Sequence, residues 1–499
     1  MFNPGGFMIN NYERKIVEMQ DQIEVLSQFV TGDWQHCEIH DVEEMIFRAL
    51  LKVGKSALEA YVEKKGTGEK AFGDNISHYS EKKWDYISIF GTLNISRAYF
   101  WKPDKGSGIF PLDKDLNLPQ KHHSYLLQDW NQILAVDNNF DSARECLEKI
   151  LGLNIWTRQS EEINRSAAGA VDQFYKDNPQ SEQIQPILVA EIDGKGIVMR
   201  KDNPDKEEKT NIRLKRGEKN GKKKMATVTA VFGVERNIRD VDDIIKQEIG
   251  NSASNPGKTE LKIATEDGPK PENKMVRATL DGKKKAFERI VDEVRNRDPE
   301  NKCERVLLMD GEPALEKKAK EYLIPLCFIF ILDLFHVMEK LWKLCYFFCA
   351  EASIESIQWV RKYLTMILDG KVGYFIGAIR QIITKGKYSK SKKNKIEKIL
   401  RYFEKRKKYM KYDEYLAKGY PVGSGVIEGT CRSFVKDRME LSGMRWSKIG
   451  AEAMLELRSI KVNGRWNDFW SYFINKEKER KYSHYDSYYD SENTGIKVA

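Results

Sequence analysis

Three acidic residues stand beside glycine at points where the hydrophobic pattern of the chain breaks. They are Asp193 in Glu-Ile-Asp-Gly-Lys-Gly, Asp310 in Leu-Leu-Met-Asp-Gly-Glu and Glu428 in Gly-Ser-Gly-Val-Ile-Glu-Gly. Taken singly, an Asp-Gly pair is more typical of a turn. The two aspartates, however, follow apolar runs typical of buried strands, so their carboxylates would lie at the edge of a sheet. Converging carboxylates repel one another, and a pair of divalent cations would supply both counter-charge and phosphoryl-transfer chemistry.

Two basic stretches predict a partner with a phosphate backbone. Residues 385–411 contain thirteen Lys or Arg against two Glu, a local charge of +11 in a chain whose net charge is +9. Residues 200–224 contain eleven basic and five acidic residues. The alternative is a solvated helix face and a flexible loop. The predicted DNA contacts in the two stretches are Arg213, Lys215, Arg216, Lys222, Lys223, Lys224, Lys405, Arg406, Lys407 and Lys408.

The elements that must position these residues begin with a mostly helical N-terminal half. Apolar residues recur at helical spacing in 12–29 and 42–64, and residues 84–101 read as a small β-meander. Two further helices, 141–151 and 157–171, are separated by a turn at Gly152, which is the outline of a helix-turn-helix. Its second helix would present Arg158, Gln159 and Arg165 to DNA, the alternative being two ordinary packed helices.

The pattern changes to α/β after residue 186. Apolar strands at 187–192, 226–234, 306–309 and 326–332 alternate with helices, and a long helical stretch follows His336. We therefore expect an N-terminal helical region (1–80), a β-meander and loop (81–120), a helix-turn-helix-like DNA-binding region (121–180), the first part of a core (181–340), a basic α-helical insertion (341–418), C-terminal core helices carrying Glu428 (419–475) and a disordered tail (476–499).

Composition limits the class of protein. The 499 residues are 32% charged and 41% hydrophobic, which disfavours wholesale disorder and a membrane protein. The N-terminus lacks a secretory signal pattern, so we expect a cytoplasmic, nucleoid-associated protein. Seven cysteines without a Cys-x-x-Cys pair argue against disulfides and a structural zinc. The sequence contains no Walker-type loop, so we expect no nucleotide cofactor.

Several motifs together resemble the ISKra-type insertion-sequence transposases, which are allied to the Mutator-type group. The resemblance covers about residues 90–470 and is most specific around Glu428 and Trp446. Its motifs are Asp-Gly-Lys-Gly with the basic segment that follows, Leu-Asp-Leu-Phe-His-Val, Gly-Ser-Gly-Val-Ile-Glu-Gly-Thr-Cys-Arg and Gly-Met-Arg-Trp-Ser. The family consists of DDE enzymes, so the resemblance implies an α/β fold with an RNase H-like catalytic core interrupted by the helical insertion.

The resemblance also implies roles for individual residues. Asp193, Asp310 and Glu428 fall on the family's catalytic carboxylates, which would bind two Mg²⁺ or Mn²⁺ ions. Asp333 and His336 match its Asp-x-x-His pair, either as accessory groups or as a pair that braces the end of the sheet. A cysteine pair expected after the meander is missing between Tyr99 and Pro111, so we predict no zinc ribbon.

Basic and aromatic residues after Glu428 complete the predicted DNA surface. Arg432 and Arg438 follow it at four and ten residues and would contact the DNA backbone. Trp446 could stack on an unpaired base at a transposon end, or it could be a buried aromatic that holds the last helices.

The function predicted from these features is that of a DNA transposase. It would bind the terminal inverted repeats of its element, cleave a phosphodiester and join the freed 3′ hydroxyl to target DNA, acting as a homodimer or higher oligomer on double-stranded DNA. The alternatives are an RNase H-like nuclease that does not join strands and a non-catalytic DNA-binding protein. A glycosidase with paired carboxylates is disfavoured by the basic stretches.

Overall fold

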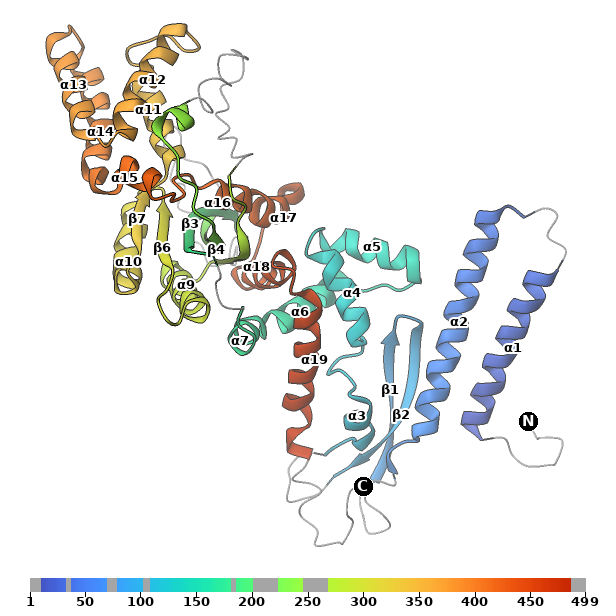
Figure 1. The fold of residues 1–499 in the computed structure, drawn as a ribbon. Coiled ribbons are helices and arrows are strands. Elements are labelled where there is room, and N and C mark those ends of the chain that lie inside the picture. Colours follow the sequence, from blue (N-terminus) through green and yellow to red (C-terminus); the bar gives the residue numbers. More distant parts are fainter. Residues whose placement is uncertain are drawn as a thin grey trace, which may run out of the picture. The chain divides into compact units, whose positions relative to one another are not determined.

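The computed structural model describes residues 10–32, 37–69, 79–101, 108–180, 185–200, 223–245 and 268–485 (Figure 1). The chain forms two compact units, one of residues Val171–Arg465 and one of residues Met1–Ala170 with Trp466–Ala499. Among the described helices, none is both long enough and apolar enough to cross a membrane.

The first unit begins with two long helices and a β-hairpin. Helix α1 (Asn11–Thr31) starts at a capping box between Asn10 and Glu13 and packs against α2 (Ile39–Lys65). Strands β1 (Tyr79–Ser88) and β2 (Gly91–Phe100) pair in antiparallel register as the predicted meander requires. Gly91, at φ +117°, opens the second strand.

A cluster of three helices follows the hairpin and the short helix α3 (Pro111–Leu116). Helix α4 (Tyr125–Ala135) packs against both α5 (Phe140–Leu151) and α6 (Thr157–Ala168). Helix α5 ends at Gly152, whose backbone is in the left-handed region, and this confirms the turn predicted there. A buried polar network joins α4 to α6, in which Gln132 bonds to Ser160 and Asn164. The predicted pair of helices is therefore held by a third.

The C-terminal helix completes this unit, which corrects the expected tail. Helix α19 (Trp466–Tyr482) donates a hydrogen bond from the Trp466 indole to Asp129 at 2.6 Å, and the Tyr482 hydroxyl donates to the Leu118 carbonyl at 2.7 Å. Tyr482 and Tyr485 are buried against the β-hairpin. Residues 476–485 are thus ordered by aromatic burial rather than disordered, and α19 belongs with the N-terminal unit rather than the core; residues 486–499 lie outside the described part.

The second unit is built on a five-stranded mixed sheet, which confirms the α/β class. The strands are β3 (Ile187–Val198), β4 (Lys223–Val234), β5 (Glu272–Thr279), β6 (Glu304–Met309) and β7 (Ile329–Leu332). Their order is β5-β4-β3-β6-β7. The pairs β3–β4 and β4–β5 are antiparallel, whereas β3–β6 and β6–β7 are parallel. The edge strand β5 was not predicted, because its first half is charged.

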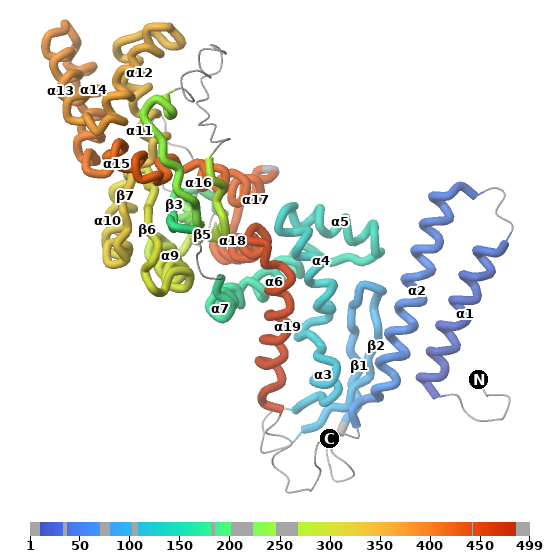
Figure 2. Tube along the Cα trace, viewed as in Figure 1, coloured from blue at the N-terminus to red at the C-terminus, as the bar shows by residue number. Residues whose placement is uncertain are grey.

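Helices cover the sheet and extend beyond it (Figure 2). Those of the core are α7 (Val171–Asp177), α9 (Lys283–Arg297), α10 (Pro313–Leu323), α11 (Leu334–Cys345), α16 (Gly425–Thr430), α17 (Asp437–Met439) and α18 (Lys448–Val462). The predicted helical insertion comprises α12 (Ile354–Leu368), α13 (Val372–Lys385), α14 (Lys390–Arg406) and α15 (Tyr412–Ala417), with its own apolar core. Hydroxyls of Tyr412 and Tyr415 donate to carbonyls of β7, so the insertion is tied to the sheet edge.

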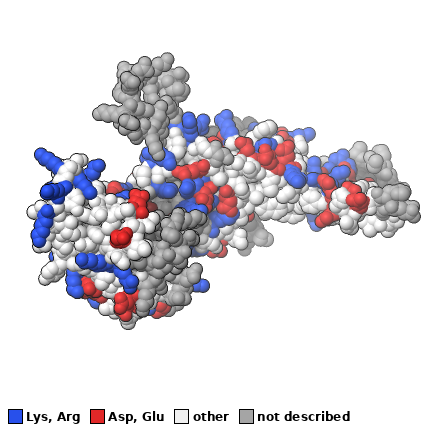
Figure 3. Space-filling view, turned by 90° about the horizontal axis from the view of Figure 1, so that it is seen from above, with Lys and Arg blue, Asp and Glu red and all other residues white. Residues whose placement is uncertain are grey.

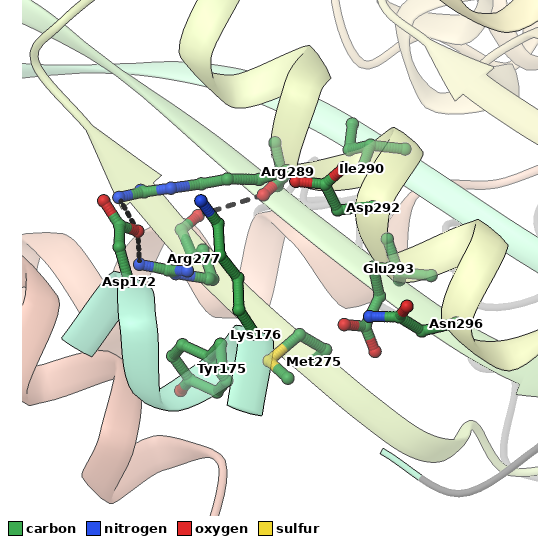
Figure 4. Close-up of a pocket in the computed structure, with 12 residues that line it drawn as sticks. Asp172, Tyr175, Lys176, Met275, Arg277, Arg289, Ile290, Asp292, Glu293 and Asn296 are labelled. Atoms are coloured by element: carbon green, nitrogen blue, oxygen red, sulfur yellow. Dashed lines mark hydrogen bonds and ion pairs between the residues drawn. The ribbon is translucent and has the colours of Figure 1, made fainter. Parts of the chain in front are cut away.

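An ionic network joins four elements of this unit, and Figure 4 shows its members Asp172, Arg277 and Arg289. Arg277 on β5 and Arg289 on α9 both bond to Asp172 on α7, at 2.7 and 2.8 Å, and both also bond to Glu456 on α18. Arg277 and Glu456 are buried, and the Arg277 guanidinium lies 4.5 Å from the ring centre of Tyr175. The network therefore fixes α7, α9 and α18 against β5.

Candidate active site

An aspartate stands directly after the parallel-paired part of each of three neighbouring strands, although β3 itself continues to Val198. Ile192 of β3 pairs with Met309 of β6, and Met309 pairs with Leu332 of β7. The next residues along the three strands are Asp193, Asp310 and Asp333, so they lie at the same end of the sheet. Helix α16, which carries Glu428, packs against β3 and β4 beside them. The structure thus brings the three predicted catalytic carboxylates to one end of the parallel part of the sheet. The expectation that Asp193 follows the end of its strand is wrong, because β3 continues past it in antiparallel pairing with β4.

The electrostatics of this edge reflect crowded negative charge. Burial raises the pKa of Asp310, and the charge of Asp193 raises it further against the opposing effects of the Glu312 amide and His336. Burial also raises the pKa of Glu428, with Asp333 and Asp193 adding to the rise. Among the described residues, no Lys or Arg forms an ion pair with Asp193, Asp310 or Glu428. The site therefore has an excess of negative charge that a cation would relieve.

The donor chemistry fits hard divalent cations, which prefer carboxylate oxygen. Protein donors occupy several of these oxygens: Asp193 accepts from the Gly194 amide at 2.6 Å and from the Cys431 thiol at 3.3 Å, and Asp310 accepts from the Glu312 amide at 2.7 Å. The Glu428 side chain is exposed. In the described part of the chain, no three acidic, histidine or cysteine side chains are gathered closely enough to hold one ion.

Asp333 and His336 form a bracing pair. Asp333 is fully buried; one oxygen accepts from the amides of Phe335 and Ser424, and the other accepts from the amide of His336 and lies 2.6 Å from its ring Nδ1. This bond raises the pKa of His336, whose charge in turn lowers the pKa of Asp310 and Glu428. Of the two roles considered for the pair, the geometry favours the brace.

One further acidic residue of the site was missed. Glu191 lies two residues before Asp193 on the same face of β3, is fully buried and accepts a hydrogen bond from the Ile427 amide at 2.6 Å. Burial raises its pKa well above the usual range for a glutamate. The signal was present in the sequence, because Glu191 is the one charged residue in the apolar run 187–192.

The prediction that Arg406 contacts DNA is wrong. Arg406 is buried, its Nε donates to the Gly311 carbonyl at 2.8 Å, and its guanidinium lies 4.3 Å from the ring centre of Tyr402. The Tyr402 hydroxyl donates to the Asp310 carbonyl at 3.1 Å. Gly311 adopts φ +80°, where a side chain would be strained. Helix α14 therefore fixes the turn that presents Asp310.

Arg406→Met is expected to lower the free energy of unfolding by about 1–3 kcal/mol, because the Gly311 carbonyl loses its donors. Urea denaturation of the full chain measures this change. Lys405→Met is the matched control, since the neighbouring Lys405 is exposed and should change stability by less than about 0.5 kcal/mol. Equal stability of the two variants would show that Arg406 does not hold this turn.

Arg438 and Trp446 are also turned inward. Arg438 is fully buried with its guanidinium 5.0 Å from the Trp446 ring centre, and the Trp446 indole donates to the Met439 carbonyl at 3.0 Å. Because both side chains are buried, the prediction that Arg438 and Trp446 contact DNA is wrong. Trp446 instead has the alternative role considered for it, that of a buried aromatic, and it packs against Arg438. Arg432 is exposed, as a DNA contact requires.

The other predicted DNA contacts are distributed over both units. Arg158 and Arg165 on α6 are exposed and pair with Glu162 and Glu161, one turn away, while the Gln159 side chain accepts from the Trp156 amide. The face of α6 is thus not strongly positive. Lys223 pairs with Glu440 at 3.0 Å, and Lys224 lies beside it on β4. Arg213, Lys215, Arg216 and Lys222 lie outside the described residues.

The insertion carries a surface rich in positive charge, which we call the α14 lysine surface; of its residues, Arg401 pairs with Glu397 and Lys411 with Glu414. Arg380 of α13 pairs with both acidic residues of the stretch, Glu397 and Glu404. Figure 3 shows Lys and Arg gathered over the insertion. The surface consists of the exposed residues Lys385, Lys387, Lys390, Lys395, Lys398, Arg401, Lys405, Lys407, Lys408 and Lys411.

No protein-family model matches the chain, and comparison with curated proteins returns no match.

Proposed function

We propose that the protein is a DDE transposase, a metal-dependent enzyme that cleaves the ends of an insertion sequence and joins them to target DNA. The observation that carries the proposal is the convergence of Asp193, Asp310 and Glu428 at one sheet edge without a basic partner among the described residues. Crowded acidic side chains of this kind are expected where cations bind.

The arrangement of the second unit supports an RNase H-like core. The first acidic residue lies on the central strand β3, the second follows the adjacent parallel strand β6, and the glutamate lies on a helix that comes after a helical insertion. This is the order of catalytic groups that the resemblance implies. We therefore assign Asp193, Asp310 and Glu428 as the residues that would hold two Mg²⁺ or Mn²⁺ ions.

When bound, such a pair of ions activates the attacking oxygen and stabilises the leaving oxygen in each phosphoryl transfer. The protein chain holds the carboxylates in place. Asp193 is fixed by its strand, and Asp310 is fixed by the turn that α14 holds. Glu428 lies in the first turn of α16 and is exposed.

Binding of double-stranded DNA is assigned to two surfaces. The α14 lysine surface presents charge for phosphate contacts, which carry little sequence information. End recognition is assigned to α6, through Arg158, Gln159 and Arg165, in the three-helix cluster of the first unit. Assembly as a homodimer or higher oligomer and a nucleoid-associated location belong to the same proposal.

The proposal is tested by incubating the purified protein with DNA carrying the ends of its flanking element, with Mg²⁺ or Mn²⁺. We expect cleavage at the element ends and joined products on a sequencing gel. Cleavage without joining would indicate a nuclease instead. DNA binding without cleavage in either metal would indicate a non-catalytic DNA-binding protein.

Replacing Lys405, Lys407 and Lys408 together by alanine is expected to weaken DNA binding and to make its logarithmic salt dependence shallower by up to about 2.7, which is about 0.9 for each lost phosphate contact. Fluorescence anisotropy over a salt series measures the slope. A triple variant of Lys284, Lys302 and Lys317 removes the same charge from exposed positions outside the insertion and should leave the slope nearly unchanged. Identical slopes for the two triple variants would contradict a DNA-binding role for the insertion.

A further inference from the structure

We infer that Glu191 is a positioning residue for Glu428: its carboxyl group holds the first turn of α16 against β3 and thereby sets where the third carboxylate of the site stands. The inference deepens the proposed function and rests on it for its catalytic consequence. Its structural consequence, the hold on α16, is independent of any activity.

Helix α16 lacks a local cap at its start, and at its end it continues directly into a π-helical turn, Cys431–Lys436, and α17. It spans six residues from Gly425 to Thr430, and the side chain of Ser424 forms no capping hydrogen bond. The first amides of a helix have no partner within the helix, so they must bond elsewhere. The amide of Ile427, the third residue of α16, donates to Glu191 Oε2 at 2.6 Å. Glu191 thus acts as a cap supplied by a neighbouring strand.

A second buried carboxylate holds the same segment. The amide of Ser424 donates to Asp333 Oδ1 at 2.8 Å. Glu191 comes from the central strand β3, and Asp333 follows the edge strand β7, so the segment 424–427 is tied to the sheet at two separate points. Glu428 is the next residue, and its own amide donates to the Ser424 carbonyl at 3.2 Å. The backbone position of Glu428 is therefore set by the hydrogen bonds that Glu191 and Asp333 accept from this segment.

The burial of Glu191 is costly without such a role. The residue is 0% exposed, and its second oxygen, Oε1, has no hydrogen-bond partner among the described residues. A buried carboxyl group with an unsatisfied oxygen destabilises a fold, and an apolar residue at this strand position would avoid the cost. The hydrogen bond from the Ile427 amide is the interaction of Glu191 that offsets this destabilisation.

The position of Glu191 couples the carboxylates of the site. Residues 191 and 193 point to the same face of β3 because side chains alternate along a strand. One strand therefore carries Asp193 and also fixes the helix of Glu428, so the spacing of these two groups depends on a single rigid element. Loss of the Glu191 bond would loosen the backbone at Glu428, leaving the Ser424–Asp333 bond as its remaining tie, while Asp193 stays in place.

Two full-length variants separate this role from others. Glu191→Gln keeps an acceptor for the Ile427 amide, whereas Glu191→Leu removes it at similar volume. By hydrogen–deuterium exchange, Glu191→Leu should speed exchange in the peptide spanning 424–431 by about three- to tenfold, and Glu191→Gln should leave it near wild type. In the cleavage assay, Glu191→Leu should need more Mn²⁺ for half-maximal rate at unchanged DNA affinity, and Glu191→Gln should not.

Several results would overturn the inference. Wild-type exchange in Glu191→Leu would show that the bond does not hold α16. Inactivity of a folded Glu191→Gln would show that the charge of Glu191 is needed directly. Should Glu191→Leu not fold, Glu191→Asp shortens the side chain and should give the same faster exchange. If the wild-type protein cleaves no DNA, the transposase proposal fails, while the exchange experiment still decides the role of Glu191.

Discussion

Asp193→Asn, Asp310→Asn and Glu428→Gln are each expected to reduce strand cleavage and joining by about 10³-fold, the upper range for removal of one preorganised electrostatic group. Each change removes one negative charge at little cost in volume, so an ion loses a ligand while the fold is kept. DNA affinity should remain near wild type, because the phosphate contacts assigned to the α14 lysine surface are untouched. Single-turnover cleavage and anisotropy measure the two effects.

Glu312→Gln is the control for these variants. Glu312 lies two residues after Asp310, and its exposed side chain pairs with Lys283 at 2.6 Å. The Glu312→Gln variant should cleave DNA at a rate close to that of the wild-type protein. Wild-type cleavage by any one of the three carboxylate variants would remove that residue from the set of metal ligands. Activity in all three would refute the proposed catalytic site.

Glu456→Gln is expected to lower the free energy of unfolding by about 3–5 kcal/mol, the range for breaking a buried ion pair by removing one partner. Glu456 bonds to both Arg277 and Arg289 in the buried network, so the neutral amide leaves two guanidinium groups without most of their counter-charge. The remaining partner, Asp172, is half-exposed and is shared between them. Urea denaturation followed by circular dichroism measures the loss.

The matched control for Glu456→Gln lies on a solvent-exposed face. Glu288→Gln on α9 breaks an exposed pair with Lys284, and such pairs contribute about 0–1 kcal/mol. A loss in Glu456→Gln no larger than in Glu288→Gln would mean that the buried network does not stabilise the sheet. Because none of the network residues is among the proposed metal ligands, Glu456→Gln should keep its cleavage rate at temperatures where it remains folded.

The amino-acid sequence by itself determined the places of the acidic groups. Asp193 and Asp310 follow apolar runs typical of buried strands, and β3 and β6 pair in parallel up to the residues before these two aspartates. The continuation of β3 past Asp193 to Val198 was not apparent from the pattern. The α/β class, the helical insertion and the turn at Gly152 followed from local periodicity and backbone preference in the same way. These features depend on residues close together in the chain, which is why pattern alone could predict them.

Only the tertiary structure decided which charged residues face solvent. Arg406 and Lys405 are adjacent in one basic stretch, yet Arg406 turns inward to the Gly311 carbonyl while Lys405 stays exposed. Arg438 likewise packs on Trp446. A helix has one buried face, and which of its charges falls there depends on what packs against it from elsewhere in the chain.

The same limit applies to the contacts that complete each unit. Helix α19 returns to the N-terminal unit through Trp466, Tyr482 and Tyr485, and no pattern within residues 466–485 names that partner. Glu191 accepts its hydrogen bond from Ile427, a residue 236 positions away in the sequence. Local sequence sets the type of each element, but burial and hydrogen bonding between distant segments set their partners, so these assignments required the folded chain.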